Sequence, residues 1–232
     1  VDHRANATVL KAAQQAGVAQ MVMLSAICVQ KPTLAFQHAK LAFEAELIAS
    51  GLTYSIVRPT AFFKSLAGQV ARVQAGKPYL VFGDGTLTAC KPISDRDLGA
   101  YITRCIADPA LHNLILPIGG PGPALTPRDM GEYLFAAKGK PPKFKQVPLG
   151  LIRGIGKVLG VAGRVSPKLA TKAELARIGH YYASESMLLW DDAQQRYDAE
   201  ATPETGTDRL FDYYNALLDG RETLARAEHS VF

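Results

Sequence analysis

The chain has 232 residues, of which 48% are hydrophobic and 20% are charged. This length and balance are enough for one substantial core, or for one domain with an attached lobe, and they exclude a disordered or collagen-like chain. The net charge is +5. We take this excess to be spread along the chain, which suits an anionic ligand or surface and makes nucleic acid a poor partner. No apolar run reaches the roughly 18–20 residues that a membrane-spanning helix needs.

Two features bear on the compartment and on the start of the chain. The three cysteines, Cys28, Cys90 and Cys105, are widely spaced and form no CxxC pair, which predicts reduced thiols in a cytosolic type of compartment. The chain opens on Val1 inside what the apolar spacing predicts to be a helix that ends at Gly17. Because natural domains rarely begin in mid-element, we expect a fragment that has lost its N-terminal part.

The first quarter of the chain predicts strands that alternate with helices. Residues 18–25 form an apolar run typical of a strand buried on both faces, and residues 36–51 repeat apolar side chains at helical spacing. Residues 52–58 predict a second strand, which ends at Pro59. Strand, helix and strand this close together make a parallel crossover unit. The predicted fold class is therefore α/β with a parallel sheet.

The remaining elements are less regular. The expected strands are 77–82, 113–118 and 144–147, and the expected helices are 62–74, 97–107 (capped by Ser94 or Asp95), 126–137, 149–159 and 208–218.

Three polar side chains are expected at, or close to, the ends of the two early strands. Ser25 closes the first strand, Pro59-Thr60 follow the second, and Lys40 lies one turn into the helix between them. In open parallel sheets, ligands bind beyond the carboxyl ends of the strands. We therefore expect these side chains to converge on one crevice.

This spacing resembles the short-chain dehydrogenase/reductase superfamily, in which a strand-end serine is followed by YxxxK at the start of the next helix. Longer stretches of sequence narrow the match: LSAICVQKP (24–32), FQHAKLAFEAEL (36–47), YSIVRPTAFFKSL (54–66), FGDG (82–85), ACKPISDRDL (89–98), LPIGGPG (116–122) and YYASESML (181–188). They resemble the NADPH-dependent divinyl chlorophyllide 8-vinyl reductases, which are atypical, NmrA-like members of that superfamily. The resemblance runs to about residue 215.

The resemblance implies roles for individual residues. Lys40 matches the lysine that hydrogen-bonds the nicotinamide ribose and supports hydride delivery, and Ser25 matches the catalytic strand-end serine. The loop expected to flank the nicotinamide consists of Pro59, Thr60, Ala61 and Phe62. No metal is expected among the site residues.

Phe36 departs from the superfamily pattern, because it stands where YxxxK has tyrosine. Phenylalanine has no proton to give, so tyrosine-centred acid catalysis on a carbonyl is excluded. Reduction of a conjugated carbon–carbon double bond fits this residue, since the negative charge then spreads over the substrate. Phe36 is a candidate substrate contact. Water, His38, Cys28 and Tyr54 remain open as sources of the proton.

A second departure concerns the cofactor's phosphates. The superfamily holds the pyrophosphate on a Gly-rich turn at a helix N-terminus, and no GxxGxxG or GxGxxG occurs in these 232 residues. The resemblance implies that the first β-α-β units precede Val1, so we expect this polypeptide to be inactive alone. Residues 1–120 then form the C-terminal part of a Rossmann-like NADP-binding domain. Residues 121–232 form a mixed α/β substrate lobe with C-terminal helices.

The expected function is NADPH-dependent reduction of the 8-vinyl group of divinyl chlorophyllide or protochlorophyllide to ethyl, in chlorophyll or bacteriochlorophyll biosynthesis. The alternatives are another reductase of a conjugated alkene and a non-catalytic NADP(H)-sensing regulator. The expected location is a bacterial cytoplasm, at the surface of a photosynthetic membrane, with the chloroplast as the alternative. Residues 149–163 place Arg153 and Lys157 among apolar residues, which is compatible with a roof over the pigment or with membrane contact.

Overall fold

A computed structural model describes residues 2–151, 154, 159 and 166–223 of the chain. It divides into two compact units with interleaved segments. The first unit comprises Val1–Ala61, Lys91–Gly122 and Leu188–Asp208, and the second comprises Phe62–Cys90, Pro123–Met187 and Arg209–Phe232. The chain thus passes between the units after residues 61, 90, 122, 187 and 208. The single boundary expected after residue 120 stays a prediction.

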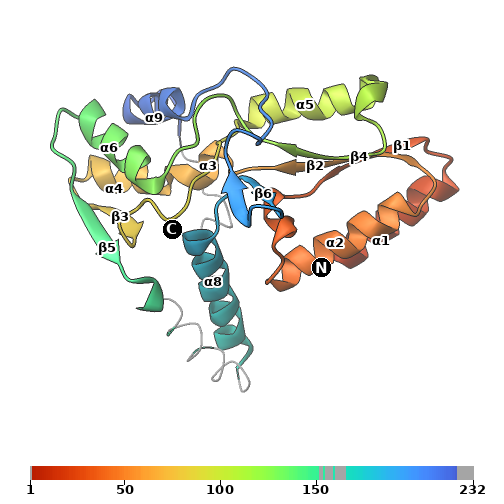
Figure 1. Cartoon of the computed structure of the whole chain (residues 1–232), viewed down its shortest axis with the longest axis horizontal. Coiled ribbons are helices and arrows are strands. Elements are labelled where there is room, and N and C mark those ends of the chain that lie inside the picture. The colour runs from red at the N-terminus through yellow and green to blue at the C-terminus, as the bar shows by residue number, and fades with distance from the viewer. Residues whose placement is uncertain (1, 152–153, 155–158, 160–165, 224–232) are drawn as a thin grey trace. The chain divides into compact units, whose positions relative to one another are not determined.

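The first unit is built on a three-stranded parallel sheet, which confirms the predicted α/β class. Its strands are β1 (Gln20–Leu24), β2 (Thr53–Pro59) and β4 (Leu114–Ile118), in the order β1-β2-β4 (Figure 1). Each strand comes from an apolar run, as expected for a sheet covered by helices on both faces. The register pairs Leu24 with Val57 and Val57 with Leu116, so all three strands end at the same edge.

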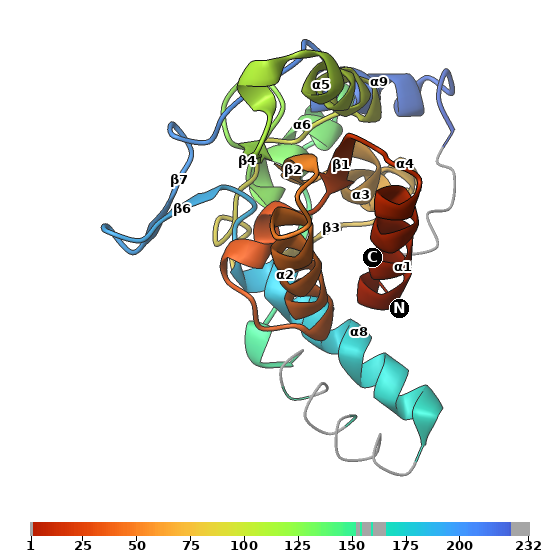
Figure 2. The same cartoon turned by 90° about the vertical axis from the view of Figure 1, so that its right-hand side faces the viewer.

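Helices cover both faces of this sheet. Helices α1 (Asp2–Gln15) and α2 (Ala35–Ile48) lie on one face, and α5 (Asp95–Ala107) lies on the other (Figures 1 and 2). The side chain of Ser94 accepts a hydrogen bond from the backbone N–H of Asp97 at 3.0 Å, so the predicted cap of α5 is confirmed. Between α1, α2 and the sheet lies a core cluster of Leu10, Met23, Phe43, Leu47 and Ile56.

Two short helices and a hairpin complete the first unit. The 3₁₀ helices are η1 (Ile27–Gln30) and η3 (Pro109–Leu111), and the hairpin is formed by β6 (Leu189–Asp191) and β7 (Arg196–Asp198). The side chain of Gln30 ties this late segment to the start of the chain, since it donates to the carbonyl of Leu188 and accepts from the N–H of Trp190.

The second unit has a two-stranded parallel sheet of β3 (Tyr79–Phe82) and β5 (Phe144–Val147). Its helices are α3 (Phe63–Leu66), η2 (Ala67–Gln69), α4 (Val70–Gln74), α6 (Pro127–Ala137), α8 (Pro167–Ser184) and α9 (Leu210–Leu218). The helix expected over 62–74 is therefore three short segments, and α8 is an addition to the prediction. The helix expected over 149–159 lies mostly outside the described residues. Within the described part of the chain, no helix has the length and apolar content needed to cross a membrane.

Candidate functional site

The carboxyl ends of the three strands of the first unit meet at one edge. The N–H of Ser25, just after β1, donates to the carbonyl of Val57 in β2 at 2.7 Å. The N–H of Thr60, just after β2, donates to the carbonyl of Ile118 in β4 at 3.0 Å. The two predicted strand-end positions are thus brought to the same edge by backbone pairing alone.

A buried carboxylate links these strand ends to α2. Glu44 is 2% exposed, and its Oε1 accepts hydrogen bonds from the Ser25 hydroxyl at 2.5 Å and from Arg58 Nε at 3.1 Å. The other carboxylate oxygen pairs with the Arg58 Nη2 group. One carboxylate therefore binds together the end of β1, the end of β2 and the middle of α2. No local pattern in the sequence marks this role for Glu44.

Lys40 lies on the face of α2 that Glu44 defines. Residues four apart on a helix share a face, so Phe36, Lys40 and Glu44 form one row. Because Glu44 contacts Ser25 and Arg58, this row faces the strand ends, with Lys40 one turn closer to the helix N-terminus. Lys40 is half-buried and forms no ion pair within the described residues, which leaves its ammonium group for a ligand.

The start of α2 is fixed by Gln37, which is fully buried. Its Oε1 accepts from the N–H groups of Thr33 and Leu34 at 2.7 and 2.9 Å, and its Nε2 donates to the carbonyl of Cys28 at 3.0 Å. These bonds satisfy loop donors next to the helix start and attach α2 to η1. The neighbouring Phe36 is thereby held on a rigid element.

The loop after β2 is held from within the first unit. The Thr60 hydroxyl donates to the carbonyl of Lys91, and the N–H of Ile93 donates to the carbonyl of Ala61 at 2.9 Å. Thr60 is only 5% exposed, so its hydroxyl shapes the loop. Phe62, the last residue predicted for this loop, is the N-cap of α3 and belongs to the second unit.

Lys91 is a buried cation that no local sequence pattern marks. It is 6% exposed, and its ammonium pairs with Glu204 and lies 3.4 Å from the carbonyl of Thr202. The second oxygen of Glu204 accepts from the N–H of Gly122 at 3.2 Å. The positive charge of Lys91 is thus compensated, and the carbonyl of the same residue accepts the hydrogen bond from Thr60.

The three candidate proton donors lie in different surroundings. Tyr54 is at the start of β2, the end opposite Pro59, where it packs against the core cluster. His38 is exposed on α2, two residues beyond Phe36 and therefore off the row that faces the strand ends. Cys28 is 2% exposed in η1, next to the strand end. Of the three side chains, Tyr54 is therefore the one placed least well to donate a proton at the strand ends.

Comparison with known proteins finds similar reductases. A family model described as NAD(P)H-binding matches residues 1–109. The divinyl chlorophyllide a 8-vinyl-reductase of Oryza sativa subsp. indica is 51% identical over 98% of this chain, and that of Arabidopsis thaliana is 49% identical over 98%. The chain is homologous to these reductases. The resemblance seen in the sequence blocks is confirmed, and the chain spans 57% and 56% of the length of these curated relatives.

The solved structures similar to this reductase homologue give its fold. An isoflavone reductase superposes with a TM-score of 0.67 at 17% identity, over 91% of this chain and 70% of that one. An NADPH-dependent quinone oxidoreductase from Escherichia coli, solved with NADPH, gives 0.62 at 18% identity, again over 91% and 70%. The fold is the NAD(P)-binding Rossmann-like fold.

The residues present fit one end of a dinucleotide. Among the described residues, Lys40 is a half-buried cation without an ion-pair partner, on the helix row that faces the strand ends, where open parallel sheets bind ligands. The Gly-rich turn for the pyrophosphate is not among these 232 residues. That Lys40 holds the nicotinamide ribose stays a prediction from the resemblance.

Proposed function

We propose that this chain forms the nicotinamide end of an NADPH-dependent reductase that converts the 8-vinyl group of a divinyl chlorophyllide or protochlorophyllide to ethyl. The observation that carries the proposal is the row Phe36–Lys40–Glu44, directed at the strand ends by the bonds of Glu44 to Ser25 and Arg58. About 50% identity to named 8-vinyl-reductases supports the choice of substrate.

Each residue of the site has a proposed task. Lys40 binds the ribose hydroxyls, and its positive charge supports delivery of the hydride to the substrate. Pro59 and Ala61 form an apolar wall on a loop fixed by Thr60 and Lys91. Ser25 and Glu44 hold the strand end and the helix in register. When bound, NADPH supplies the hydride, so the work of this chain is positioning.

The proposed reaction adds a hydride and a proton across the vinyl double bond and leaves NADP⁺. The developing charge spreads over the conjugated macrocycle, so no localised alkoxide forms that demands a phenolic donor. Phe36 therefore acts as an apolar contact for the pigment. Water or Cys28 remains a source for the proton.

The pigment also bears on location. A chlorophyllide is flat and apolar with a carboxylate, so it partitions to a lipid surface. A protein that binds at this surface takes up the pigment directly. We propose peripheral contact with a photosynthetic membrane. The compartment stays a prediction: a bacterial cytoplasm, or the chloroplast that the names of the plant relatives specify.

The test uses the protein expressed from its complete reading frame, mixed with NADPH and divinyl chlorophyllide. We expect a blue shift of the pigment's absorbance as conjugation shrinks. Lys40→Met is expected to lower kcat by about a hundredfold. Lys11→Met, which removes an exposed lysine of α1, is the matched control and should leave turnover unchanged.

Two results would count against the proposal. The first is no blue shift although fluorescence demonstrates bound NADPH, which would favour a sensor of the cofactor. The second is a Lys40→Met protein that turns over like its parent.

A further inference from the structure

The positive charge of the chain is concentrated in one tract, which corrects the even spread assumed from the total. Residues 133–173 hold nine of the 26 Lys and Arg residues and none of the 21 Asp and Glu residues. The remainder has 17 basic and 21 acidic residues, a net charge of −4. A charge asymmetry of this kind gives a protein one face that attracts anions.

Four of the described lysines of this tract gather around the start of β5. Lys138 caps α6, Lys140 and Lys143 flank Pro141-Pro142, and Lys145 is on β5 itself. All but Lys138 are exposed, and Lys138 is half-buried.

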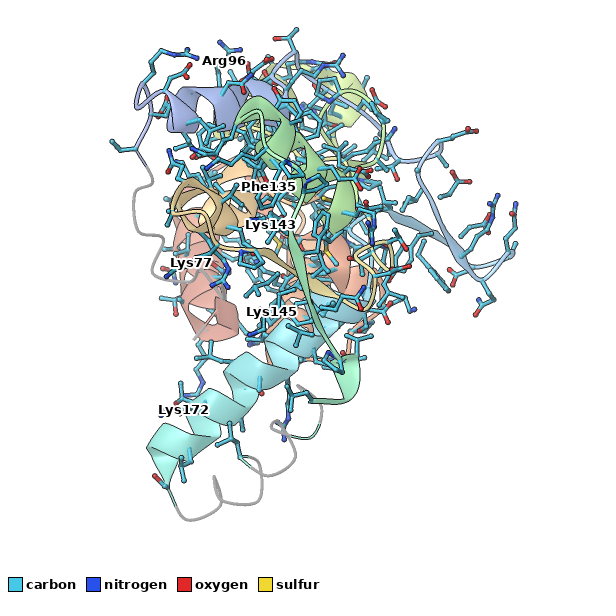
Figure 3. The ribbon with its side chains drawn as sticks, turned by 90° about the vertical axis from the view of Figure 1, so that its left-hand side faces the viewer. Lys77, Arg96, Phe135, Lys143, Lys145 and Lys172 are labelled. Atoms are coloured by element: carbon cyan, nitrogen blue, oxygen red, sulfur yellow. The ribbon has the colours of Figure 1, made fainter. Side chains whose placement is uncertain are left out.

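The pairing of β3 with β5 adds a fifth lysine. The N–H of Tyr79 donates to the carbonyl of Lys143 at 2.8 Å, and the register matches Tyr79 with Phe144. Lys77, two residues before Tyr79, therefore lies beside the start of β5. Figure 3 shows Lys77, Lys143 and Lys145 on the same side of the second unit. We name Lys77, Lys138, Lys140, Lys143 and Lys145 the basic face.

The basic face has no counter-charge among the described residues. None of its five lysines takes part in an ion pair in that part of the chain. The acidic residues that bracket the tract, Glu132 and Glu174, pair with Arg128 and Arg177 of their own helices at 3.6 and 3.3 Å. The face is therefore available to an external anion.

The second unit also exposes apolar side chains, one soon after β5 and one on α8. Leu151, four residues after β5, is 56% exposed. Leu175 on α8 is 47% exposed and follows the exposed Lys172, which Figure 3 also labels. Cations combined with exposed leucines fit a lipid surface better than a nucleic acid, whose bases need exposed aromatic rings.

We infer that the basic face is a docking surface for anionic lipid bilayers. The choice of a lipid partner rests on the proposed function, because its pigment is apolar. Edge protection is the competing explanation, since lysines on an edge strand discourage aggregation. It accounts for Lys145 on β5, but Lys77, Lys138 and Lys140 are not on the strand.

The test is co-sedimentation with vesicles, without pigment or NADPH, so its failure is separate from failure of the proposed activity. One set of vesicles is pure phosphatidylcholine, and the other contains about one-third phosphatidylglycerol. We expect binding to the anionic set only, and release at about 0.5 M salt. The variant K140Q/K143Q/K145Q should bind about a hundredfold more weakly.

The matched control is R4Q/K11Q/R104Q, which removes the same charge from exposed positions of the first unit and should bind like the parent. Restored binding by K140R/K143R/K145R would support a charge effect. Equal losses in both glutamine variants would overturn the proposal, as would competition by millimolar glycerol phosphate. A glutamine variant that aggregates but still binds anionic vesicles would overturn it in favour of edge protection, and binding to RNA or an acidic protein in place of vesicles would also overturn it.

Discussion

Ser25 donates its hydroxyl proton to the carboxylate of Glu44 over 2.5 Å, and both side chains are buried. The serine to which the resemblance assigns a catalytic role thus donates its hydrogen bond to an internal acceptor. Its oxygen can still accept a hydrogen bond. This relationship makes the stability of the strand ends and the placement of Lys40 parts of one network.

The ion pair within this network is expected to contribute strongly to stability. Glu44→Gln leaves the Arg58 guanidinium, whose side chain is 18% exposed, without its counter-charge. We expect a loss of about 3 kcal/mol in the free energy of unfolding, at the low end for buried pairs because Arg58 is partly exposed. Urea unfolding measures this loss. The double variant Glu44→Leu/Arg58→Met should lose less than the sum of its single variants, and additive losses would contradict the coupling.

Two loops approach each other closely at this edge, so we expect that Gly120 cannot be replaced by a residue with a side chain. A Cβ on Gly120 would lie 1.9 Å from the carbonyl oxygen of Pro92. Gly120→Ala must displace backbone, so we expect a loss of several kcal/mol, on the scale of severe core changes. Gly99→Ala, inside α5 with nothing within 4 Å, should instead stabilise by about 1 kcal/mol. Thermal unfolding compares the two, and equal midpoints would refute the packing argument.

Phe36 offers a test of the proposed proton chemistry. Phe36→Tyr restores the superfamily's phenol, and we expect vinyl reduction to stay within about twofold of the parent because no phenolic donor is needed. The measurement is kcat for the protein from its complete reading frame. A large gain in rate would mean that the proton donor limits the reaction.

A buried thiol and two buried phenols in the second unit predict a loss of stability at high pH. Burial raises the pKa of the Cys90 thiol from 9.0 to about 12, and it raises the pKa of Tyr79 and Tyr214 above 10.0. These groups stay protonated in the folded state, while the unfolded chain releases their protons above pH 9 to 10. Stability is therefore fully present below about pH 9 and falls as the pH rises toward the folded-state values.

Denaturant midpoints measured at about pH 8 and about pH 10.5 test this dependence. Tyr79→Phe removes one of the three groups and should reduce the difference between the two midpoints. A midpoint that stays flat over this range would contradict the prediction.

Local sequence signals were sufficient for much of the fold. The apolar runs of β1 and β2, the Ser94 cap of α5 and the Thr126-Pro127 start of α6 each encode their element within a few residues. The hairpin of β6 and β7 lacked such a signal, because its strands have three residues each and its turn places Gln195 at a positive φ of 51° without glycine.

Part of the site could also be predicted, because local sequence signals define the positions of some of its residues. Ser25 and Lys40 stand at positions that strand ends and helix spacing define locally. Glu44 has no such local mark, since its partners are 19 and 14 residues away and meet it only through the register of β1 with β2. Lys91 depends on Glu204, 113 residues further along the chain.

The pairing of Lys91 with Glu204 has a genetic consequence. The residues proposed for the site all lie within the first 61 residues. A nonsense codon ahead of residue 204 would nevertheless remove the counter-ion of the buried Lys91 ammonium and leave the loop after β2 without that support. Alleles truncated ahead of residue 204 should therefore yield as little folded protein as alleles truncated early.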